Sequence, residues 1–333
     1  MAEDLPVLVV GATGFLGAQV VDELLKRGKK VRALVRPKSN AAKLEAKGVE
    51  IARGDMLDAA SLITAMTGVS AAISTAAGYT RNDKNAKAID TFGNSNLAVA
   101  AKHAGVPRFV LISIVTSDQT PPQIPHFWNK KLAEDKFEEL GVPFVALRPG
   151  AFFDQAVGMG GDPFAKGRFV WLGSKDARLT FVLASDVAAY LAEAVDADIV
   201  EGERIDIGWS RPLSIHEAAE IAGRRAGKQI KVMSIPAGAI AGLGKVTAKI
   251  LPLVGDMASM VAWFETGKYV ADVTRQEQVF GPPAPTPPED ALPGWRHATA
   301  TDNGAGLMLV GEVERKYPDD TDSAAGPDCV EKT

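Results

Sequence analysis

The sequence predicts an α/β protein built on a doubly wound parallel sheet, followed by a smaller C-terminal region. Strand and helix patterns alternate through residues 5–150. The strand segments are short, continuously apolar runs, which is typical of strands covered on both faces. Glycines stand where helix patterns stop, as C-terminal caps do, at Gly28, Gly48, Gly105 and Gly141.

Residues 1–150 are expected to form the first domain. Its strands are predicted at 7–10, 30–35, 49–52, 69–74, 108–114 and 143–147, and its helices at 15–27, 39–47, 58–66, 86–104 and 128–140. Strands joined by crossover helices give a Rossmann-like arrangement, in which ligands bind outside the carboxyl ends of the strands. Parts of 180–210 are expected to complete the sheet.

After residue 150 the alternation loosens. Residues 151–180 are rich in Gly, Phe and Asp and indicate loops with short strands, and a helix is expected at 185–196, with Ser185 or Asp186 as its N-cap. Ser214 and Glu217 form a predicted capping box before a helix at 215–226. Residues 236–268 indicate two helical pieces divided near 252–255, and the proline-rich and then polar stretch 281–333 indicates an extended, mobile arm and tail.

The turn after the first strand carries three glycines at a spacing of three. Glycine lets the backbone turn tightly and approach a ligand, and the following helix offers free N–H groups to a pyrophosphate. A glycine triplet alone can also be a tight turn without a ligand, but its place between strand and helix favours nucleotide binding. The predicted cofactor contacts here are Gly11, Thr13, Gly14, Phe15, Leu16 and Gly17.

The second strand ends where a dinucleotide fold places an acid on the adenosine ribose. This chain has Arg36 there, with Lys38 nearby. A guanidinium can grip the 2′-phosphate of NADP, so NADP(H) is favoured over NAD. The alternative is that Arg36 only solvates the end of the strand.

Two further strand ends supply candidate cofactor contacts. Asp55 and Met56 follow the third strand, where a carboxylate can accept from the adenine amino group; Asp55 can equally be an N-cap for the next helix. Thr75 and Ala76 follow the fourth strand, and small residues there let the backbone pass beneath a cofactor.

Four motifs stand in order: Gly11-Ala12-Thr13-Gly14-Phe15-Leu16-Gly17, Gly54-Asp55, the segment 100–110 (AAKHAGVPRFV), and Arg148-Pro149-Gly150. This set resembles the atypical and extended short-chain dehydrogenase/reductases, in particular NmrA-like and isoflavone-reductase-like NADP-binding proteins. The resemblance spans roughly residues 5–280 and is weaker after 150. It implies an NADP-binding domain, a substrate-binding region at 151–280, and contacts to the nicotinamide from Pro149, Gly150 and Phe152.

Active short-chain dehydrogenases use a Ser, a Tyr and a Lys, with Tyr-x-x-x-Lys on one helix face. The resemblance places Lys130 in the lysine position, His126 in the tyrosine position and Ser113 in the serine position. A histidine can donate a proton near neutral pH. The alternatives are that His126 is an exposed loop residue and that Lys130 lies on a solvated helix face.

An aromatic-lined cleft would suit a flat or apolar substrate. The candidates for its lining are Phe152, Phe153, Asp154, Met260, Trp263 and Phe264, each of which ordinary core packing also explains. The predicted function is NADPH-dependent reduction of a carbonyl or conjugated acceptor. The alternative is a non-catalytic NADP(H)-sensing regulator, and an epimerase is disfavoured because the tyrosine is missing.

Composition excludes several other classes. The net charge of −4 without a basic block argues against nucleic acid, and the single cysteine, Cys329, excludes a disulfide framework. The four histidines show no metal-ligand spacing, so no metal is expected. The acidic N-terminus is unlike a signal peptide, and Lys245, Lys249, Pro252 and Asp256 interrupt the most apolar long segment, so we expect no membrane span. A cytoplasmic monomer or homodimer is expected.

Overall fold

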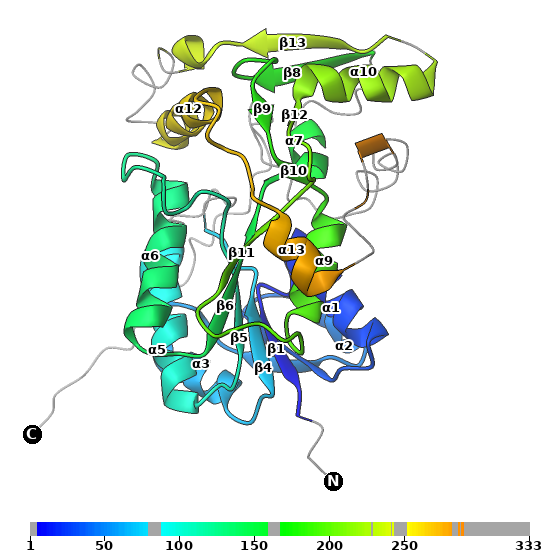
Figure 1. Ribbon diagram of the computed structural model, residues 1–333. Helices are drawn as coiled ribbons and strands as arrows, with labels where there is room; N and C mark the ends of the chain where they lie inside the picture. The colour runs from blue at the N-terminus through cyan, green and yellow to red at the C-terminus, as the bar shows by residue number, and fades with distance from the viewer. Residues whose placement is uncertain are drawn as a thin grey trace, which may run out of the picture.

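The computed structural model describes residues 5–78, 88–158, 167–227, 229–240, 242, 252–281, 286 and 288–289. A seven-stranded parallel sheet forms the base of the molecule (Figure 1). Its strands lie in the spatial order β11 (Arg204–Ile207), β6 (Phe144–Pro149), β5 (Phe109–Ile112), β4 (Ala71–Ser74), β1 (Val7–Val10), β2 (Val31–Val35) and β3 (Glu50–Arg53). This order confirms the doubly wound prediction, and the carboxyl ends of the strands meet at one edge.

Helices cover both faces of the sheet (Figure 1). Side chains alternate between the two covered faces along each strand. Val7 and Val9 of β1 face one helical layer, and Leu8 and Val10 face the other. The first layer contains α1 (Phe15–Lys26), α2 (Ala42–Glu45) and α9 (Ala184–Glu193); the second contains α3 (Ala59–Met66), α5 (Asn94–Ala104) and α6 (Pro125–Glu139). Burial on both faces explains why these strands are continuously apolar.

The predicted helix at 86–104 contains a π-helical turn. The π-helix η1 (Ile89–Gly93) leads directly into α5, which ends at Gly105 in the left-handed conformation. Residues 86 and 87 lie outside the described residues. A π-turn inside a helix is rare and often occurs at a functional site, because it changes the direction in which side chains point.

A smaller lobe lies beyond the carboxyl ends of the strands (Figure 1). Its aromatic core contains Phe153, Phe169, Trp171, Phe181 and Trp209. Short strand pairs build it: β7 (Ala151–Phe152) with β10 (Phe181–Val182), β9 (Arg178–Leu179) with β12 (Leu213–Ser214), and β8 (Arg168–Leu172) with β13 (Lys231–Ile235). Its helices are α7 (Phe153–Gly158), α10 (Ile215–Ala226) and α12 (Pro252–Glu265).

The helix caps after residue 150 match the sequence predictions only in part. The capping box of Ser214 and Glu217 is present at α10, as predicted. The prediction that Ser185 or Asp186 caps α9 is wrong, because that helix begins at Ala184 with Leu183 in the N-cap position. Asp154 supplies the missing oxygen, since its Oδ2 accepts from the Ala184 N–H at 3.3 Å.

The chain returns to the sheet after the small lobe. The helix α13 (Thr274–Phe280), which no sequence pattern predicted, packs against β11. Gln276 is buried there and pairs with both backbone groups of Gly208 at 2.7 and 3.3 Å. Of the predicted arm and tail, only residues 281, 286, 288 and 289 belong to the described part of the chain.

Candidate functional site

The glycine turn lies between β1 and α1 and brings backbone N–H groups to the carboxyl edge of the sheet. Gly11 has φ of +88°, which strongly favours glycine, and its carbonyl accepts from the Gly14 N–H at 2.8 Å. A Cβ on Gly17 would lie 2.1 Å from the Gly11 carbonyl oxygen, so the first turn of α1 closes directly on the loop. Thr13 is exposed, Phe15 is half-buried and Leu16 is buried.

The start of α1 has the features of an anion site. Gly14 is its N-cap residue, and no side chain caps this end of the helix. The first N–H groups of a helix lack partners within it, and the helix dipole is positive there. The turn therefore fits a pyrophosphate in both shape and charge.

The loop after β4 borders this turn. The Thr75 N–H and hydroxyl both donate to the Val10 carbonyl, at 2.9 and 3.1 Å, so Thr75 is fixed against the end of β1. A Cβ on Gly11 would come within 2.7 Å of the Thr75 hydroxyl oxygen. Thr75 and Ala76 are half-buried, and the structure places both beside the glycine turn.

The ends of β2 and β3 carry the residues predicted to contact adenosine. Arg36 and Lys38 are exposed just beyond β2. The Arg53 guanidinium donates to the carbonyls of Arg36 and Ser39, at 3.2 and 2.7 Å, and so fixes the course of this loop. The positively charged loop is one strand away from the glycine turn, since β2 pairs with β1.

Asp58, and not Asp55, is the N-cap of α3. The Asp58 carboxylate accepts from the N–H groups of Ala60 and Ser61, whereas Asp55 accepts from the Leu57 N–H at 2.9 Å in a local turn. This finding removes the capping alternative for Asp55. Met56 is buried in the core of the sheet.

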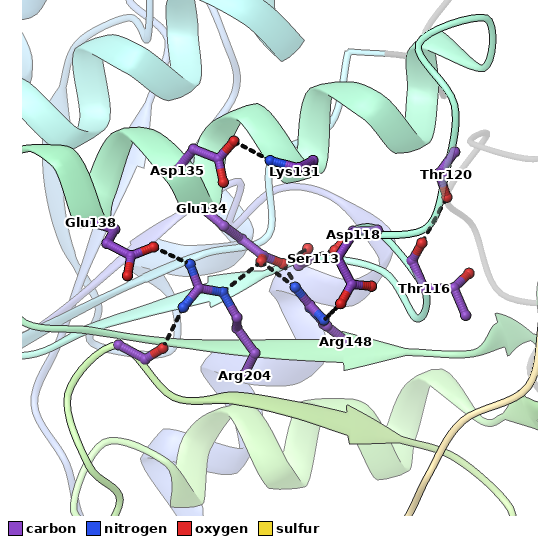
Figure 2. Close-up of polar contacts among 12 residues, drawn as sticks. Ser113, Thr116, Asp118, Thr120, Lys131, Glu134, Asp135, Glu138, Arg148 and Arg204 are labelled. Atoms are coloured by element: carbon purple, nitrogen blue, oxygen red, sulfur yellow. Dashed lines mark hydrogen bonds and ion pairs between the residues drawn. The ribbon is translucent and has the colours of Figure 1, made fainter.

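Lys130 is buried on the inner side of α6, which contradicts the alternative of a solvated helix face. Its Nζ donates to the Ile112 carbonyl, at the carboxyl end of β5, at 3.3 Å. Burial lowers the pKa of Lys130, and the nearby charges of Asp90 and Glu134 oppose that effect. Lys131, the next residue, instead pairs with Asp135 on the outer side of the helix (Figure 2).

His126 lies one helical turn before Lys130. The helix begins at Pro125 and not at residue 128, so His126 is a half-buried residue of its first turn; the alternative of an exposed loop residue is wrong. Burial, and then the charge of Lys130, lower the pKa of His126 to about 3. The ring is therefore neutral near pH 7, which disfavours the expected role of an imidazolium acid.

Ser113 belongs to a buried polar network centred on Glu134 (Figure 2). Its hydroxyl donates to Glu134 Oε1. Arg148, from β6, pairs with both oxygens of the same carboxylate, at 3.0 and 2.6 Å, and Arg204, from β11, binds Oε2 at 3.0 Å. Ser113 is thus at the predicted strand end, but its hydroxyl hydrogen is directed to a protein carboxylate.

Two acidic residues at this site were not among the predicted catalytic or cofactor-binding residues, although the resemblance already includes Glu134 four residues after Lys130. Asp90, in η1, is buried, and its Oδ1 accepts from the Gly78 N–H at 2.7 Å. Glu134 is fully buried and binds Ser113 just after β5, Arg148 near the end of β6 and Arg204 at the start of β11. Glu134 follows Lys130 by four residues, and that spacing was the available signal; the π-turn that directs Asp90 inward leaves no sequence pattern that we recognise.

At the junction of the lobes, Pro149 is the last residue of β6 and Gly150 follows it. A Cβ on Gly150 would lie 2.3 Å from the Thr180 carbonyl oxygen, so this position requires glycine. Phe152, in β7, is half-buried and packs against the core of the sheet.

The other substrate-pocket candidates belong to the aromatic core of the small lobe or pack beside it: Phe153 and Trp263 are buried in that core, and Met260 and Phe264 are half-buried against it. The Phe153 ring is edge-on to Phe181, which favours the packing alternative for Phe153. Asp154 instead accepts a hydrogen bond at the start of α9. Met260, Trp263 and Phe264 lie on α12. The Phe264 ring is 6.0 Å from the ring of Phe127, the neighbour of His126, so α12 packs over the start of α6.

Two features are absent from the described part of the chain. Within those ranges, no group of three acidic, histidine or cysteine side chains is arranged to hold a metal ion. No helix in the same ranges has the length and apolar character needed to cross a membrane.

Comparison with known proteins extends these observations. The NmrA-like family profile matches residues 3–281. A photosystem II assembly factor, Ycf39 of Cyanophora paradoxa, is 26% identical over 232 residues, which are 70% of this chain and 72% of that protein. An NAD(P)H azoreductase of Xenophilus azovorans is 26% identical over 230 residues, 69% of this chain and 77% of the azoreductase.

Solved structures share the fold. An NADPH-dependent quinone oxidoreductase of Escherichia coli, complexed with NADPH, superposes with a TM-score of 0.72 at 20% identity, covering 86% of this chain and 99% of that one. A Citrobacter sp. triphenylmethane reductase complexed with NADP(H) gives a TM-score of 0.72 at 21% identity, covering 87% and 99%.

Proposed function

Because this chain belongs to the NmrA-like family, we propose that it is an NADPH-dependent reductase whose acceptor is a small molecule with a carbonyl or conjugated system. The observation that carries the proposal is the buried Lys130 at the carboxyl end of β5, on the same sheet edge as the glycine turn. A turn with free helix N–H groups fits a pyrophosphate, and a buried ammonium on that edge fits the opposite end of a dinucleotide.

The cofactor-binding residues follow from their places along the sheet edge. The glycine turn of Gly11, Gly14 and Gly17 would hold the pyrophosphate, and the exposed Arg36 and Lys38 would hold the 2′-phosphate. Asp55 and Met56 would border the adenine, with Thr75 and Ala76 beneath the dinucleotide. Pro149, Gly150 and Phe152 would lie beside the nicotinamide.

NADPH, when bound, supplies the hydride. The part of the chain is to orient the acceptor and to provide a hydrogen-bond donor for the oxygen on which negative charge develops. Lys130 fits this role, because its Nζ carries three donors and the Ile112 carbonyl takes only one of them. It also fits a bond to the nicotinamide ribose.

A flat, apolar acceptor suits the surroundings of this lysine. Phe127 and Phe264 pack together over the start of α6, and Met260 and Trp263 lie on the same helix, α12. The quinone oxidoreductase, azoreductase and triphenylmethane reductase named above act, by their names, on acceptors that are aromatic or conjugated. We therefore propose aromatic or quinone-like acceptors first.

A second candidate is an NADPH-sensing protein that binds the cofactor without turning it over. The observation in its favour is that the tyrosine position holds a neutral histidine, His126, while the Ser113 hydroxyl is engaged with Glu134. In that case the ordered small lobe would present the NADPH-bound state to a partner.

One experiment separates the two functions. NADPH oxidation is followed by absorbance against a panel of quinones, azo dyes, aldehydes and enones, with Lys130→Met beside the wild type and Lys131→Met as the matched control. The reductase proposal predicts that Lys130→Met lowers turnover by about 100-fold or more, whereas Lys131→Met, on the outer face, retains it. If the protein binds NADPH tightly and no acceptor oxidises it, the reductase proposal is refuted and the NADPH-sensing protein remains.

A further inference from the structure

Glu134 of α6 is a buried carboxylate whose partners come from the ends of β5 and β6 and from the start of β11 (Figure 2). The Arg148 guanidinium binds both of its oxygens, at 3.0 and 2.6 Å, and Arg204 Nε binds Oε2 at 3.0 Å. The Ser113 hydroxyl bonds to Oε1, and the Ser117 hydroxyl lies 3.3 Å from the same oxygen. Such a fully bonded buried group fixes the geometry of its partners.

The chemistry of this network determines the direction of the Ser113 hydrogen bond. A carboxylate bound by two guanidinium groups accepts hydrogen bonds and donates none, so the hydroxyl of Ser113 is the donor to Glu134. The Ser113 oxygen then keeps only its lone pairs for any other partner. It can accept a hydrogen bond at the site, but it cannot donate one to an acceptor carbonyl.

Lys130 is held by the same helix, one turn before Glu134. Its Nζ donates to the Ile112 carbonyl, and Ile112 directly precedes Ser113. Ile112 and Ser113, at the end of β5, are therefore hydrogen-bonded to Lys130 and Glu134, which lie four residues apart on α6. Arg148 and Arg204 then tie that helix to β6 and β11.

The titratable groups that face Lys130 come from η1 and from α6 itself. Asp90 from η1 and Glu134 from α6 are acidic, and both raise the pKa of Lys130 against the effect of burial. His126, also from α6, is neutral near pH 7. Removing the charge of Glu134 therefore makes the ammonium form of Lys130 less stable.

We propose that Glu134 is a positioning residue, which holds Lys130 as the hydrogen-bond donor of the site and restricts Ser113 to accepting. This inference rests on the proposed function only in requiring that Lys130 contacts bound NADPH. Of Lys130 and Ser113, only Lys130 is then a hydrogen-bond donor to the acceptor. This differs from the Ser, Tyr and Lys arrangement that the resemblance implies, in which the serine can also donate.

The test measures the dissociation constant of NADPH across pH with the full chain. In the wild type, NADPH binding weakens as the pH rises through the pKa of Lys130, because the ammonium is lost. We call this rise of the dissociation constant with pH the Lys130 limb. Lys130→Met lacks the limb and gives the baseline. Glu134→Gln is expected to move the limb to lower pH by about one unit. Glu138→Gln is the matched control, since Glu138 also binds Arg204, at 2.6 Å, but lies one helical turn farther from Lys130. The pH midpoint of its limb is expected to stay within about 0.3 pH unit of the wild-type value.

The role of Ser113 has its own readout. Ser113→Ala is expected to lower turnover by less than about fivefold, whereas loss of a donor to a developing oxyanion costs about 100-fold or more. If the limb of Glu134→Gln has the same pH midpoint as the wild-type limb, the positioning role of Glu134 is overturned. A 100-fold loss of turnover in Ser113→Ala would overturn the acceptor-only assignment.

Two further arms keep the proposal testable. Glu134→Gln leaves two buried guanidinium groups with less compensation, so it can fail to fold. The double variant Glu134→Gln/Arg204→Gln then replaces it, with Arg204→Gln as its control, and the same downward shift is expected. If NADPH binds but no acceptor is reduced, the reductase proposal fails, while the pH limb of NADPH binding still decides the role of Glu134.

Discussion

Substitution of Gly17 by alanine tests whether the glycine turn holds the cofactor. The added Cβ would lie 2.1 Å from the Gly11 carbonyl oxygen and 2.8 Å from the Thr75 hydroxyl oxygen. Ordinary contact begins at 3.4 Å, so the loop must move by about 1.3 Å, and the obstacle is backbone, not the end of a flexible side chain. Overpacking of this kind costs about 1–3 kcal/mol of folding free energy.

The larger effect is expected on NADPH binding. A displacement of that size takes the N–H groups of the turn out of hydrogen-bond range of a pyrophosphate, and each bond to a charged group contributes about 1.5–3 kcal/mol. Gly17→Ala should therefore raise the dissociation constant of NADPH by about 100-fold, which a fluorescence titration measures directly. Thermal unfolding with and without NADPH provides an independent readout, since a ligand that binds only the native state raises the melting temperature.

Gly28→Ala is the matched control at the other end of α1. Gly28 has φ of +73°, and a Cβ added there would have no heavy atom within 4 Å, so alanine costs about 1 kcal/mol of backbone strain without a clash. Its NADPH affinity should equal that of the wild type. NADPH binding by Gly17→Ala within about threefold of the wild type would refute the assignment of this turn to the pyrophosphate.

Three further predictions concern the cofactor, pH and stability. Arg36→Ala should weaken NADPH binding by about 10- to 100-fold and leave NADH binding unchanged, as measured by parallel titrations; equal losses for both would remove Arg36 from the 2′-phosphate. The pKa of His126 is lowered to about 3 in the folded chain, so only the unfolded chain binds a proton on His126 as the pH drops below about 6.5, and the free energy of unfolding falls. In denaturant titrations, His126→Phe should lessen the stability lost between pH 7 and pH 5 by up to about 2 kcal/mol. An unchanged loss would contradict the buried, neutral ring. Gln276→Leu leaves both buried backbone groups of Gly208 without their partner and should cost about 2–3 kcal/mol in the same assay, whereas the exposed Gln278→Leu should cost less than about 0.5 kcal/mol.

The sheet could be predicted because its information is local. Each strand of the first domain is a short apolar run, and each crossover helix repeats its apolar residues at helical spacing, so composition and period alone locate them. The ends of the elements were less certain. Residues 39–47 were predicted as one helix, and the structure has only α2 (Ala42–Glu45) there, because tertiary contacts decide how far a weak helical pattern extends.

The parts that could not be predicted depend on distant partners. The pairing of β8 with β13 joins segments about sixty residues apart, and α13 is stabilised by packing on β11 and not by its own pattern. The candidate site follows the same rule. Lys130 was found from its motif, whereas the role of Glu134 required knowing that Arg148 and Arg204 converge on one carboxylate from two different strands.

The late position of β11 in the chain has a consequence for how the protein is made. β6 (Phe144–Pro149) emerges from the ribosome well before Arg204–Ile207, its neighbour in the finished sheet, and before α13, which packs on that neighbour. During this interval the β6 edge is unpaired, and the Glu134 carboxylate has Arg148 but not yet Arg204. An unpaired, apolar strand edge is open to wrong pairing with other chains, so synthesis that stalls or is truncated between residues 150 and 204 should give an aggregation-prone nascent chain. Native pairing of the seven-stranded sheet therefore has to wait for Arg204–Ile207, which follow the first short strands of the small lobe.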